Sequence, residues 1–333
     1  METRYSRQIL YKNIGNEGQE QLAQSHVLIV GMGALGTHVA EGLTRSGVGE
    51  LTIVDRDYIE YSNLQRQTLF TELDAQSALP KVVAAQKALE AIRSDIQIHS
   101  YIAHVDQIFL DKHGKDVDLI IDATDNFETR QRLNDFAYQQ SIPWIYGAVV
   151  QSTYTEAAFI PGQTPCFNCV MPNLPSISMT CDTVGVIQPA VTMTTSLQIR
   201  DALKLLTNKE VAPQLTFGDI WEGSHHTIGF SRMHRDNCET CGSNPTYTYL
   251  KQAERQYAVL CGRDTVQYYN QHISQEMIAQ FLGTKGMKYK QNDYMLMFEF
   301  KGHRIISFTG GRMLIHGMRD PNQAATLIGQ LFG

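Results

Sequence analysis

The sequence predicts an α/β protein with a doubly wound, Rossmann-like, mainly parallel sheet that continues into antiparallel strands. Three observations carry this prediction. Apolar runs alternate with helical patterns from residue 26 to residue 147, which is typical of parallel strands joined by helices. From residue 149 the pattern changes to strands that follow one another directly. Two Cys-x-x-Cys pairs then predict a structural zinc site, and a small α+β domain is predicted to end the chain.

Composition excludes several classes of protein. The chain has 333 residues, enough for one large and one small domain. Its formal net charge is −6 and it has no long basic run, so nucleic acid is not an expected partner. No apolar stretch approaches the roughly 20 residues that span a bilayer, and the first residues lack a signal-peptide pattern. We therefore expect a cytoplasmic protein, away from membranes, with reduced thiols.

The N-terminal 25 residues are polar and precede the first strand, so they form an arm with a short helix over residues 16–24. Arg4 and Arg7 lie on this arm. Arginines on a short arm are usually solvated. The sharper hypothesis is that they reach a phosphate, in their own site or in that of a neighbouring subunit.

The first apolar run ends in a glycine turn, Gly31-Met32-Gly33-Ala34-Leu35-Gly36, and a helix and a second strand ending at Asp55 follow. This order is the nucleotide-binding fingerprint in its required context. Gly31 permits the tight turn, Gly33 lets the backbone approach a phosphate, and Gly36 lets the helix pack closely on the strand. The helix N-terminus suits an anion, and Asp55 is placed to hold a ribose hydroxyl. An NAD-dependent oxidoreductase would have the same turn.

Polar side chains crowd the loop after the second strand, where ligands bind in open α/β sheets. They are Ser62, Asn63, Gln65, Arg66 and Gln67. Pro80 and Lys81 then start a helix. A cation at a helix N-terminus opposes the helix dipole, so Lys81 indicates an anion nearby.

A buried strand over residues 118–122 is followed by Thr124, Asp125 and Asn126, and a helix then runs to about residue 139. Asp122, Asp125 and Asn126 form a candidate metal–phosphate site at the carboxyl end of this strand. The alternative is that Asp125 only caps the following helix. With a third strand predicted over residues 96–101, the strand over 118–122 is the fourth, and a fifth is predicted over residues 143–147.

Antiparallel strands are predicted over residues 153–160 and 214–230, with a helix over 186–206 between them. Cys166 and Cys169 form the first cysteine pair, and Cys238 and Cys241 form the second after a gap of 68 residues. Four thiolates complete a tetrahedral zinc site with no open position, which is structural and not catalytic. The alternative is four incidental cysteines. The long gap suits a staple that ties a late segment onto the domain.

Residues 243–333 predict a small α+β unit: a strand near Val259, a helix over 273–282, strands over 294–300, 303–308 and 313–316, and a final helix after Asp320-Pro321. The unit has no catalytic constellation in its sequence. Cys261 is interpreted as a small buried residue.

Several motifs occur in order and together resemble a known family. They are Arg4-x-x-Arg7-Gln8, the glycine turn, Asp55-x-Asp57, Ser62-Asn63-Leu64-Gln65-Arg66-Gln67, Pro80-Lys81, Thr124-Asp125-Asn126 and the two cysteine pairs. The set resembles the bacterial adenylyltransferases that activate ubiquitin-like sulfur carriers, those of molybdopterin synthase and of thiamin biosynthesis. The resemblance covers about residues 4–242. It implies an ATP-binding adenylation domain with a zinc site over 1–242, and a C-terminal domain of unassigned role over 243–333.

The resemblance implies that ATP, not NAD, binds at the glycine turn, with Mg²⁺. The C-terminal glycine carboxylate of a carrier ending in Gly-Gly attacks the α-phosphate, and pyrophosphate leaves. Arg7, Arg66, Lys81 and Asp125 are the implied catalytic residues, with Asp125 holding Mg²⁺ and Arg7 serving the other subunit of a homodimer. Ala34 stands where the family usually has glycine. The implied nucleotide-binding set is Gly31, Gly33, Ala34, Gly36, Asp55, Asp57, Ser62, Asn63, Arg66, Lys81, Asp125 and Asn126.

Cys181 precedes the helix over 186–206 and matches the cysteine with which thiamin-type enzymes link covalently to their carrier. Molybdopterin-type enzymes have a cysteine there too but release the adenylate for a separate sulfurtransferase, so both roles stay open.

Two other functions compete with adenylation. An NAD-dependent oxidoreductase leaves Arg66, Lys81 and Asp125 without a task. A non-catalytic scaffold for a ubiquitin-like protein leaves most of the ordered polar set without one.

Overall fold

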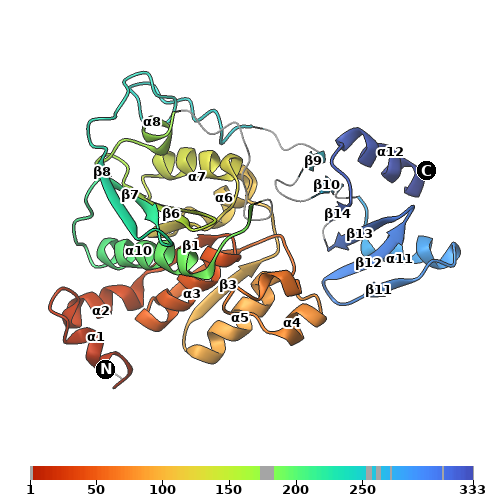
Figure 1. Ribbon diagram of the computed structural model, residues 1–333, viewed down its shortest axis with the longest axis horizontal. Helices are drawn as coiled ribbons and strands as arrows, with labels where there is room; N and C mark the ends of the chain where they lie inside the picture. The colour runs from red at the N-terminus through yellow and green to blue at the C-terminus, as the bar shows by residue number, and fades with distance from the viewer. Residues whose placement is uncertain are drawn as a thin grey trace. The chain divides into compact units, whose positions relative to one another are not determined.

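The computed structural model describes residues 3–172, 184–252, 257–259, 264–270, 272–309 and 311–332. These residues form two compact units, one up to Gln252 and one from Tyr257 onward (Figure 1). Each unit has a sheet and a hydrophobic core of its own. No helix among these residues has the length and apolar character needed to cross a membrane.

The larger unit is built on an eight-stranded sheet with the order β3-β2-β1-β4-β5-β6-β7-β8. Neighbouring strands are parallel from β3 to β5 in this order, whereas the pairs β5–β6, β6–β7 and β7–β8 are antiparallel. This confirms the predicted parallel sheet that continues into antiparallel strands. The strands are β1 (His26–Val30), β2 (Glu50–Val54), β3 (Gln97–Tyr101), β4 (Leu119–Asp122), β5 (Trp144–Val150), β6 (Thr153–Phe159), β7 (Gln214–Asp219) and β8 (Ser224–Gly229).

Helices cover both faces of this sheet, with α3, α5 and α10 on one side and α6 and α7 on the other (Figure 1). The two inner strands β1 and β4 are almost wholly buried, and they are apolar apart from His26 at the start of β1 and Asp122 at the end of β4, as strands covered on both faces require. The helices are α1 (Ser6–Ile9), α2 (Gly15–Gln24), α3 (Ala34–Ser46), α4 (Glu72–Gln76), α5 (Lys81–Ile92), α6 (Gln107–His113), α7 (Phe127–Gln140), α8 (Phe167–Val170) and α10 (Gln188–Leu206), with short 3-10 turns η1 (Thr3–Tyr5) and η2 (Tyr61–Asn63).

Helix α6 was not predicted from the sequence, although it has a clear start. Asp106 is its N-cap, and its side chain accepts a hydrogen bond from the backbone N–H of Phe109 at 2.6 Å. Phe109 and Leu110 then pack into the core beneath α7. The apolar content of a seven-residue helix is too small to show a period in the sequence, so the cap was the only available signal.

The smaller unit has a six-stranded antiparallel sheet with the order β11-β12-β13-β14-β10-β9. Helices α11 (Gln275–Thr284) and α12 (Pro321–Phe332) pack on it through one apolar cluster. The predicted helices and the three consecutive strands are confirmed, whereas β10 and β11 were missed. The strands are β9 (Tyr257–Val259), β10 (Thr265–Tyr269), β11 (Tyr289–Gln291), β12 (Met295–Phe300), β13 (His303–Phe308) and β14 (Arg312–His316).

Candidate functional site

The glycine turn joins β1 to α3 and brings three strands together. Gly31 has a φ of +95°, and a Cβ there would lie 2.6 Å from the carbonyl oxygen of Ala123, just after β4. A Cβ on Gly36 would lie 1.9 Å from the Gly31 carbonyl oxygen. Both positions therefore exclude any larger residue. By contrast, the nearest atom to a Cβ on Gly33 is Nε2 of Gln67 at 3.8 Å, so the backbone is open there.

The carboxylate of Asp55 ties the end of β2 to the glycine turn. Its Oδ2 accepts a hydrogen bond from the Met32 N–H at 2.7 Å, and its Oδ1 accepts one from the Asp57 N–H at 2.8 Å. Asp55, which the sequence predicts to hold a ribose hydroxyl, thus lies directly beside the turn that precedes α3. Since each carboxylate oxygen has more than one lone pair, these two bonds leave Asp55 able to accept further donors.

The polar loop after β2 folds back on itself next to the turn. The buried side chain of Asn63 accepts a hydrogen bond from the Glu60 N–H at 2.9 Å and so closes η2. Arg66 is half-buried, and its Nη1 donates to the Ser62 carbonyl at 2.9 Å. Gln67 is buried, and its Oε1 has no hydrogen-bond partner among the residues that the structure describes. The loop therefore places polar side chains beside the open backbone at Gly33.

Lys81 is the first residue of α5, as predicted, and is only 4% exposed. Its ammonium nitrogen lies 3.5 Å from Oδ2 of Asp57, and its backbone N–H donates to the Asp57 carbonyl at 2.9 Å. Asp57 of the same chain is therefore one anion near Lys81, as the sequence indicated. The pairing holds the ammonium group of Lys81 at the edge of the sheet where β2 ends.

The acids after β4 have separate tasks. Asn126, not Asp125, is the N-cap of α7, because its side chain accepts from the Thr129 N–H at 2.9 Å. The alternative that Asp125 caps this helix is therefore wrong. Asp125 is exposed, and its carboxylate has no hydrogen bond to any residue in the described ranges. A carboxylate left without a structural task is available to a ligand.

Asp122 belongs to the scaffold, so Asp125 is the only accessible one of the two acids in the candidate metal–phosphate site. It is fully buried, and its Oδ2 lies 2.9 Å from Nε of Arg130 on α7. Burial raises the pKa of Asp122, and the charge of Arg130 opposes that shift. Sequence reasoning missed Arg130, although an arginine one turn into a helix that follows a buried acid was a usable signal.

Arg7 is the predicted site residue that the structure does not bring to the glycine turn. It is exposed on α1, and its neighbour Gln8 donates to the carbonyl of Ser46 at the last turn of α3. Helix α3 has 13 residues, so its two ends lie about 20 Å apart. Cys181 and Cys261 lie outside the described residues.

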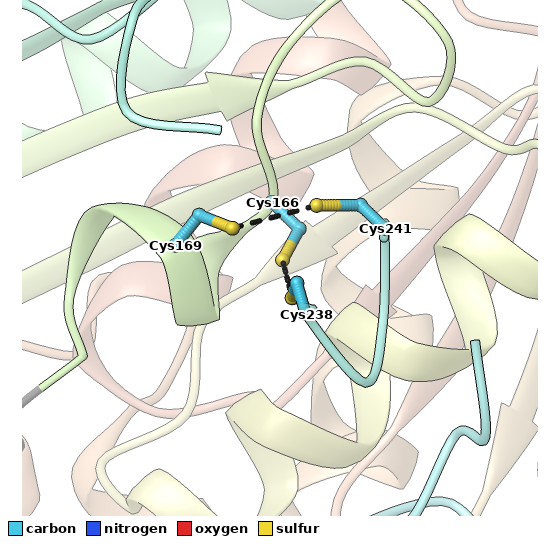
Figure 2. Close-up of side chains that lie close together, drawn as sticks. All are labelled: Cys166, Cys169, Cys238 and Cys241. Atoms are coloured by element: carbon cyan, nitrogen blue, oxygen red, sulfur yellow. Dashed lines mark hydrogen bonds between the residues drawn. The ribbon is translucent and has the colours of Figure 1, made fainter. Parts of the chain in front are cut away.

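Four cysteines converge beside α7 and form a candidate metal centre (Figure 2). Sγ of Cys166 lies 3.5 Å from that of Cys238, and the same distance joins Cys169 to Cys241. All four sulfur atoms lie within 4.8 Å of one another, and none is in a disulfide. Tetrahedral Zn–S bonds of about 2.3 Å require sulfur atoms about 3.8 Å apart, so the donor set and its spacing fit zinc.

The surroundings of the four cysteines favour thiolates at one corner of the cluster. Burial opposes ionisation of Cys238, but hydrogen bonds from the backbone N–H groups of Cys241 and Thr240 and from the side chains of Cys166 and Cys169 together outweigh burial and lower the pKa of that thiol to about 7. Arg235 lies beside the cluster and donates to the carbonyl of Asn168 at 2.5 Å. Its hydrogen bond to Cys169 raises the pKa of Arg235. A cation there would offset part of the negative charge if all four thiolates bound a metal ion.

Two buried residues of α7 hold the cysteine loops from below, and sequence reasoning missed both. Asn134 accepts from the Phe167 N–H at 2.9 Å and donates to the hydroxyl of Thr240 at 3.2 Å. Asp135 accepts from the same hydroxyl, and from the N–H groups of Tyr249 at 2.8 Å and Leu250 at 3.2 Å. Consecutive polar residues on the buried side of a helix were the signal for this network.

Known proteins resemble the chain along most or all of its length. It is 39% identical over 338 residues to the sulfur carrier protein ThiS adenylyltransferase of Bacillus subtilis, and the match covers 100% of both chains. It is 34% identical to the molybdopterin-synthase adenylyltransferase of Escherichia coli, covering 72% of this chain and 96% of that one. It is also 34% identical to the ThiS adenylyltransferase of E. coli, covering 72% and 95%.

Solved structures share the fold of the larger unit. A crystal structure of E. coli MccB with ATP superposes with a TM-score of 0.63 at 22% identity, covering 73% of this chain and 74% of that one. A crystal structure of PaaA does so with a TM-score of 0.58 at 21% identity, covering 68% and 82%. The model of the ThiF family matches residues 5–240, a range that begins in the N-terminal arm and ends between Cys238 and Cys241 of the second cysteine pair. By this match and by its full-length relative, the chain belongs to the ThiF family.

Proposed function

We propose that this chain uses ATP to adenylate the C-terminal glycine carboxylate of a ubiquitin-like sulfur-carrier protein and releases pyrophosphate. The observation that carries the proposal is one polar edge of the sheet. There the open backbone at Gly33, the Asp55 carboxylate, the buried cation of Lys81 and the exposed Asp125 follow the ends of β1, β2 and β4. The names of the family's adenylyltransferases support the same reaction.

ATP lies along this edge in the proposed complex. Asp55 accepts a ribose hydroxyl, and the phosphates approach Gly33, Ala34 and the first N–H groups of α3. Lys81 and Arg66 then stabilise charge on the phosphates, together with the Asn63 amide. Lys81 is well suited to this because burial and its contact with Asp57 restrict its motion, so little entropy is lost when a phosphate binds.

The chemical step is an in-line displacement. A carboxylate oxygen of the carrier's terminal glycine forms a bond to the α-phosphorus while the bond from that phosphorus to the bridging oxygen breaks. Pyrophosphate leaves with the electron pair, and an acyl-adenylate remains. Since no proton is removed from the nucleophile, the protein supplies positioning and electrostatic stabilisation instead of a general base.

Asp125 is the proposed magnesium ligand. Its exposed carboxylate is not used by the N-cap of α7, which Asn126 provides, and an oxygen donor of this kind is what Mg²⁺ prefers. When bound, Mg²⁺ is the source of charge neutralisation on the phosphate oxygens. Asp122 is excluded from that role because it is fully buried and paired with Arg130.

Arg7 is proposed to act on the other subunit of a homodimer. The arm that carries it is attached to α3 at Ser46, about 20 Å from the glycine turn of the same chain. An arginine side chain cannot span that distance. An exposed arginine held away from its own site can complete a neighbour's site, at the γ-phosphate side of the bound ATP.

Zinc is the proposed occupant of the four-cysteine cluster, in a structural role. All four thiolates are used, so no position is open for a substrate. The staple fixes the segment around Cys238 and Cys241 to α7. Chelation of the metal should lower the melting temperature of the purified protein, and Zn²⁺ should restore it. Unchanged melting after complete removal of the metal would contradict a structural role.

Cys181 remains a candidate for a covalent link to the carrier. The described chain resumes at Val184, and Ile187 donates its N–H to the Gln151 carbonyl just after β5, so the segment following Cys181 returns to the carboxyl edge of the sheet. Cys181→Ala should leave ATP–pyrophosphate exchange intact, because adenylation precedes any thiol chemistry. Loss of exchange in a folded variant would assign Cys181 to adenylation itself.

We assign the carrier to the thiamin type. A relative that matches the whole chain at 39% identity is named a ThiS adenylyltransferase, whereas the molybdopterin-synthase relative is 34% identical. A sulfurtransferase is a proposed further partner, since a relative in Dictyostelium discoideum, 31% identical over 74% of this chain, is named both adenylyltransferase and sulfurtransferase. We also propose a cytoplasmic location, where cysteines stay reduced and outside disulfides, as the four described cysteines do.

Carrier-dependent exchange of labelled pyrophosphate into ATP tests the proposal. ThiS-type and molybdopterin-synthase-type carriers, each with and without the terminal Gly-Gly, are compared, and the intact ThiS-type carrier should support exchange best. Asp125→Asn should reduce exchange by at least about 100-fold because a lost metal ligand removes charge stabilisation. Asp111→Asn, an exposed acid on α6, is the matched control. Exchange with no carrier, or none with either carrier, would refute the proposal.

A further inference from the structure

We propose that Gln8 is a positioning residue that acts on the active site of the partner subunit, because it holds the arm bearing Arg7 in a fixed place. The inference rests on the proposed function, in which Arg7 completes the neighbour's site. The set that holds the arm is called the arm clamp, and it consists of Gln8, Gln19 and the carbonyl group of Ser46. None of its members touches the nucleotide site of its own chain.

The arm clamp is a closed set of hydrogen bonds. Nε2 of Gln8 donates to Oε1 of Gln19 at 2.8 Å and to the Ser46 carbonyl at 2.7 Å. Nε2 of Gln19 donates to the same carbonyl at 3.0 Å. Ser46 is the last residue of α3, where carbonyl groups lack partners within the helix, so the two glutamines satisfy an acceptor that the helix leaves unpaired. Gln19 is 3% exposed, which protects these bonds from water.

A second anchor fixes the arm beside the clamp. Gly47 has a φ of +95°, and a Cβ there would lie 2.9 Å from Cζ of the Tyr5 ring and 2.4 Å from Nε2 of Gln19. The glycine thus lets both side chains close over the end of α3. The buried guanidinium of Arg93 donates to the Tyr5 hydroxyl at 3.4 Å and to the Thr44 carbonyl at 3.1 Å. Residues on both sides of Arg7 therefore bind the Rossmann body.

Arg7 itself has a different environment from its neighbours. It is exposed and makes no side-chain hydrogen bond or ion pair with any residue in the described part of the chain. The clamp thus fixes the backbone of the arm and leaves one cation pointing away from it. Buried hydrogen bonds would not be needed to keep a solvated surface arginine in place. They are needed if the position of that cation matters.

Fixing the arm in advance favours catalysis for an entropic reason. An arginine on a loose arm would lose backbone and side-chain freedom each time it reached a triphosphate, and ordering one residue's backbone costs about 1–2 kcal/mol. Displacements of about 1 Å at groups remote from the reaction can cost about 100-fold in rate. Release of the clamp should therefore reduce turnover and leave the affinity of the glycine turn for ATP nearly unchanged.

The test uses Gln8→Leu, which removes both donors and keeps the side-chain volume. The variant should remain a folded dimer with unchanged ATP affinity, while kcat for carrier-dependent pyrophosphate exchange falls about 10- to 100-fold. Gln24→Leu, the same change at an exposed position of α2, should match the wild type. Unchanged kcat in Gln8→Leu, or an equal loss in Gln24→Leu, would overturn the proposal.

Heterodimers decide in which subunit Gln8 acts. Chains with different tags are co-expressed, and dimers with Gln8→Leu in one subunit and Asp125→Asn in the other are isolated by two affinity steps. One subunit then has an intact site and the other an intact arm, so exchange should return to about half the wild-type rate, since one of two sites is complete. A heterodimer no more active than the Gln8→Leu homodimer would show that Gln8 serves its own subunit.

The Arg7→Ala/Asp125→Asn heterodimer separates failure of this inference from failure of the function beneath it. If it recovers half the activity while the Gln8→Leu pairing does not, the arm acts in trans and the clamp does not position it. If neither pairing recovers while the wild type is active, the trans role of Arg7 fails, and the inference fails with it. A wild type without carrier-dependent exchange would instead remove the proposed function itself.

Discussion

The three glycines of the turn serve different purposes, although the sequence motif treats them alike. Gly31 and Gly36 are required by packing, because a Cβ at either position would overlap backbone atoms. Gly33 is under no such restriction, since its nearest neighbour would be the flexible end of Gln67. A glycine that packing does not require indicates that something else must approach it, and the proposed ligand is a phosphate.

This difference predicts opposite behaviour for two alanine substitutions. Gly36→Ala should lower the free energy of unfolding by about 3 kcal/mol, because the turn must move to admit the methyl group. Gly33→Ala should change it by about 1 kcal/mol or less, yet should weaken ATP binding about tenfold or more. Urea unfolding and ATP titration measure the two effects. A Gly33→Ala protein that binds ATP normally would contradict the assigned role.

At the scale of elements, α7 links the two sites of the larger unit. Its start lies at Asn126, beside the proposed magnesium ligand Asp125. One turn later Arg130 pairs with Asp122 at the end of β4. In the middle of the helix, Asn134 and Asp135 hold the loops that carry the four cysteines. A single helix therefore positions both Asp125 at the polar edge of the sheet and the loops of the four-cysteine cluster.

The packing of α10 on β6 contains a buried acid that no step of the proposed reaction uses. Glu156 is 1% exposed and lies beside Asp201 and Arg200 of α10. Burial raises the pKa of Glu156 well above its usual value, the nearby Asp201 raises it further, and Arg200 opposes the shift. Folding therefore favours the protonated form of Glu156. This contribution to stability is complete below the unfolded pKa and is lost as the pH rises through the folded one.

Glu156→Gln should consequently make stability less dependent on pH. At pH 8 the variant should unfold at a higher urea concentration than the wild type. Its free energy of unfolding should be greater by on the order of 1 kcal/mol, because a neutral amide avoids the penalty of burying a charge. Near pH 4 to 5 the difference should shrink, since the wild-type carboxyl is then protonated. Paired urea titrations across this range measure the change. Equal stability at pH 8 would place an ionised, well-compensated carboxylate at this position.

At the scale of the whole molecule, the two units have separate cores, and the core of the larger unit extends past Cys241, the second residue of the second cysteine pair. Leu250 is 1% exposed within the core of the larger unit. The N–H groups of Tyr249 and Leu250 donate to the buried carboxylate of Asp135. The domain boundary predicted after residue 242 separates these groups from that core. The compact unit extends instead to Gln252.

Two truncations test where the larger unit ends. The chain 1–252 should fold and retain carrier-dependent pyrophosphate exchange. The chain 1–242 should be less stable by about 2–5 kcal/mol, because it loses a buried leucine and leaves Asp135 with fewer donors. Thermal melting and exchange assays measure both. Equal stability of the two would support the boundary at 242, and an inactive but folded 1–252 would assign the C-terminal unit a part in adenylation.

Most of the larger unit was predictable because its signals are local. Glycine turns, apolar runs and caps act within a few residues, so the strands from β1 to β8 and the helices α3, α5, α7 and α10 follow from sequence patterns. The small unit was harder. Its strands β10 and β11 pair with partners distant in sequence or lie at a sheet edge, and neither shows a strong alternation of its own.

The sequence by itself determined the fold class, the order of the polar motifs and the two cysteine pairs, because each depends on residue type and short spacing. Only the tertiary structure decided which acid remains available, since Asp122 is matched to Arg130 by packing between β4 and α7. Only it showed that Gln8 fixes the arm at the far end of α3 from its own glycine turn. Contacts of this kind join residues separated by many positions, and no local pattern encodes them.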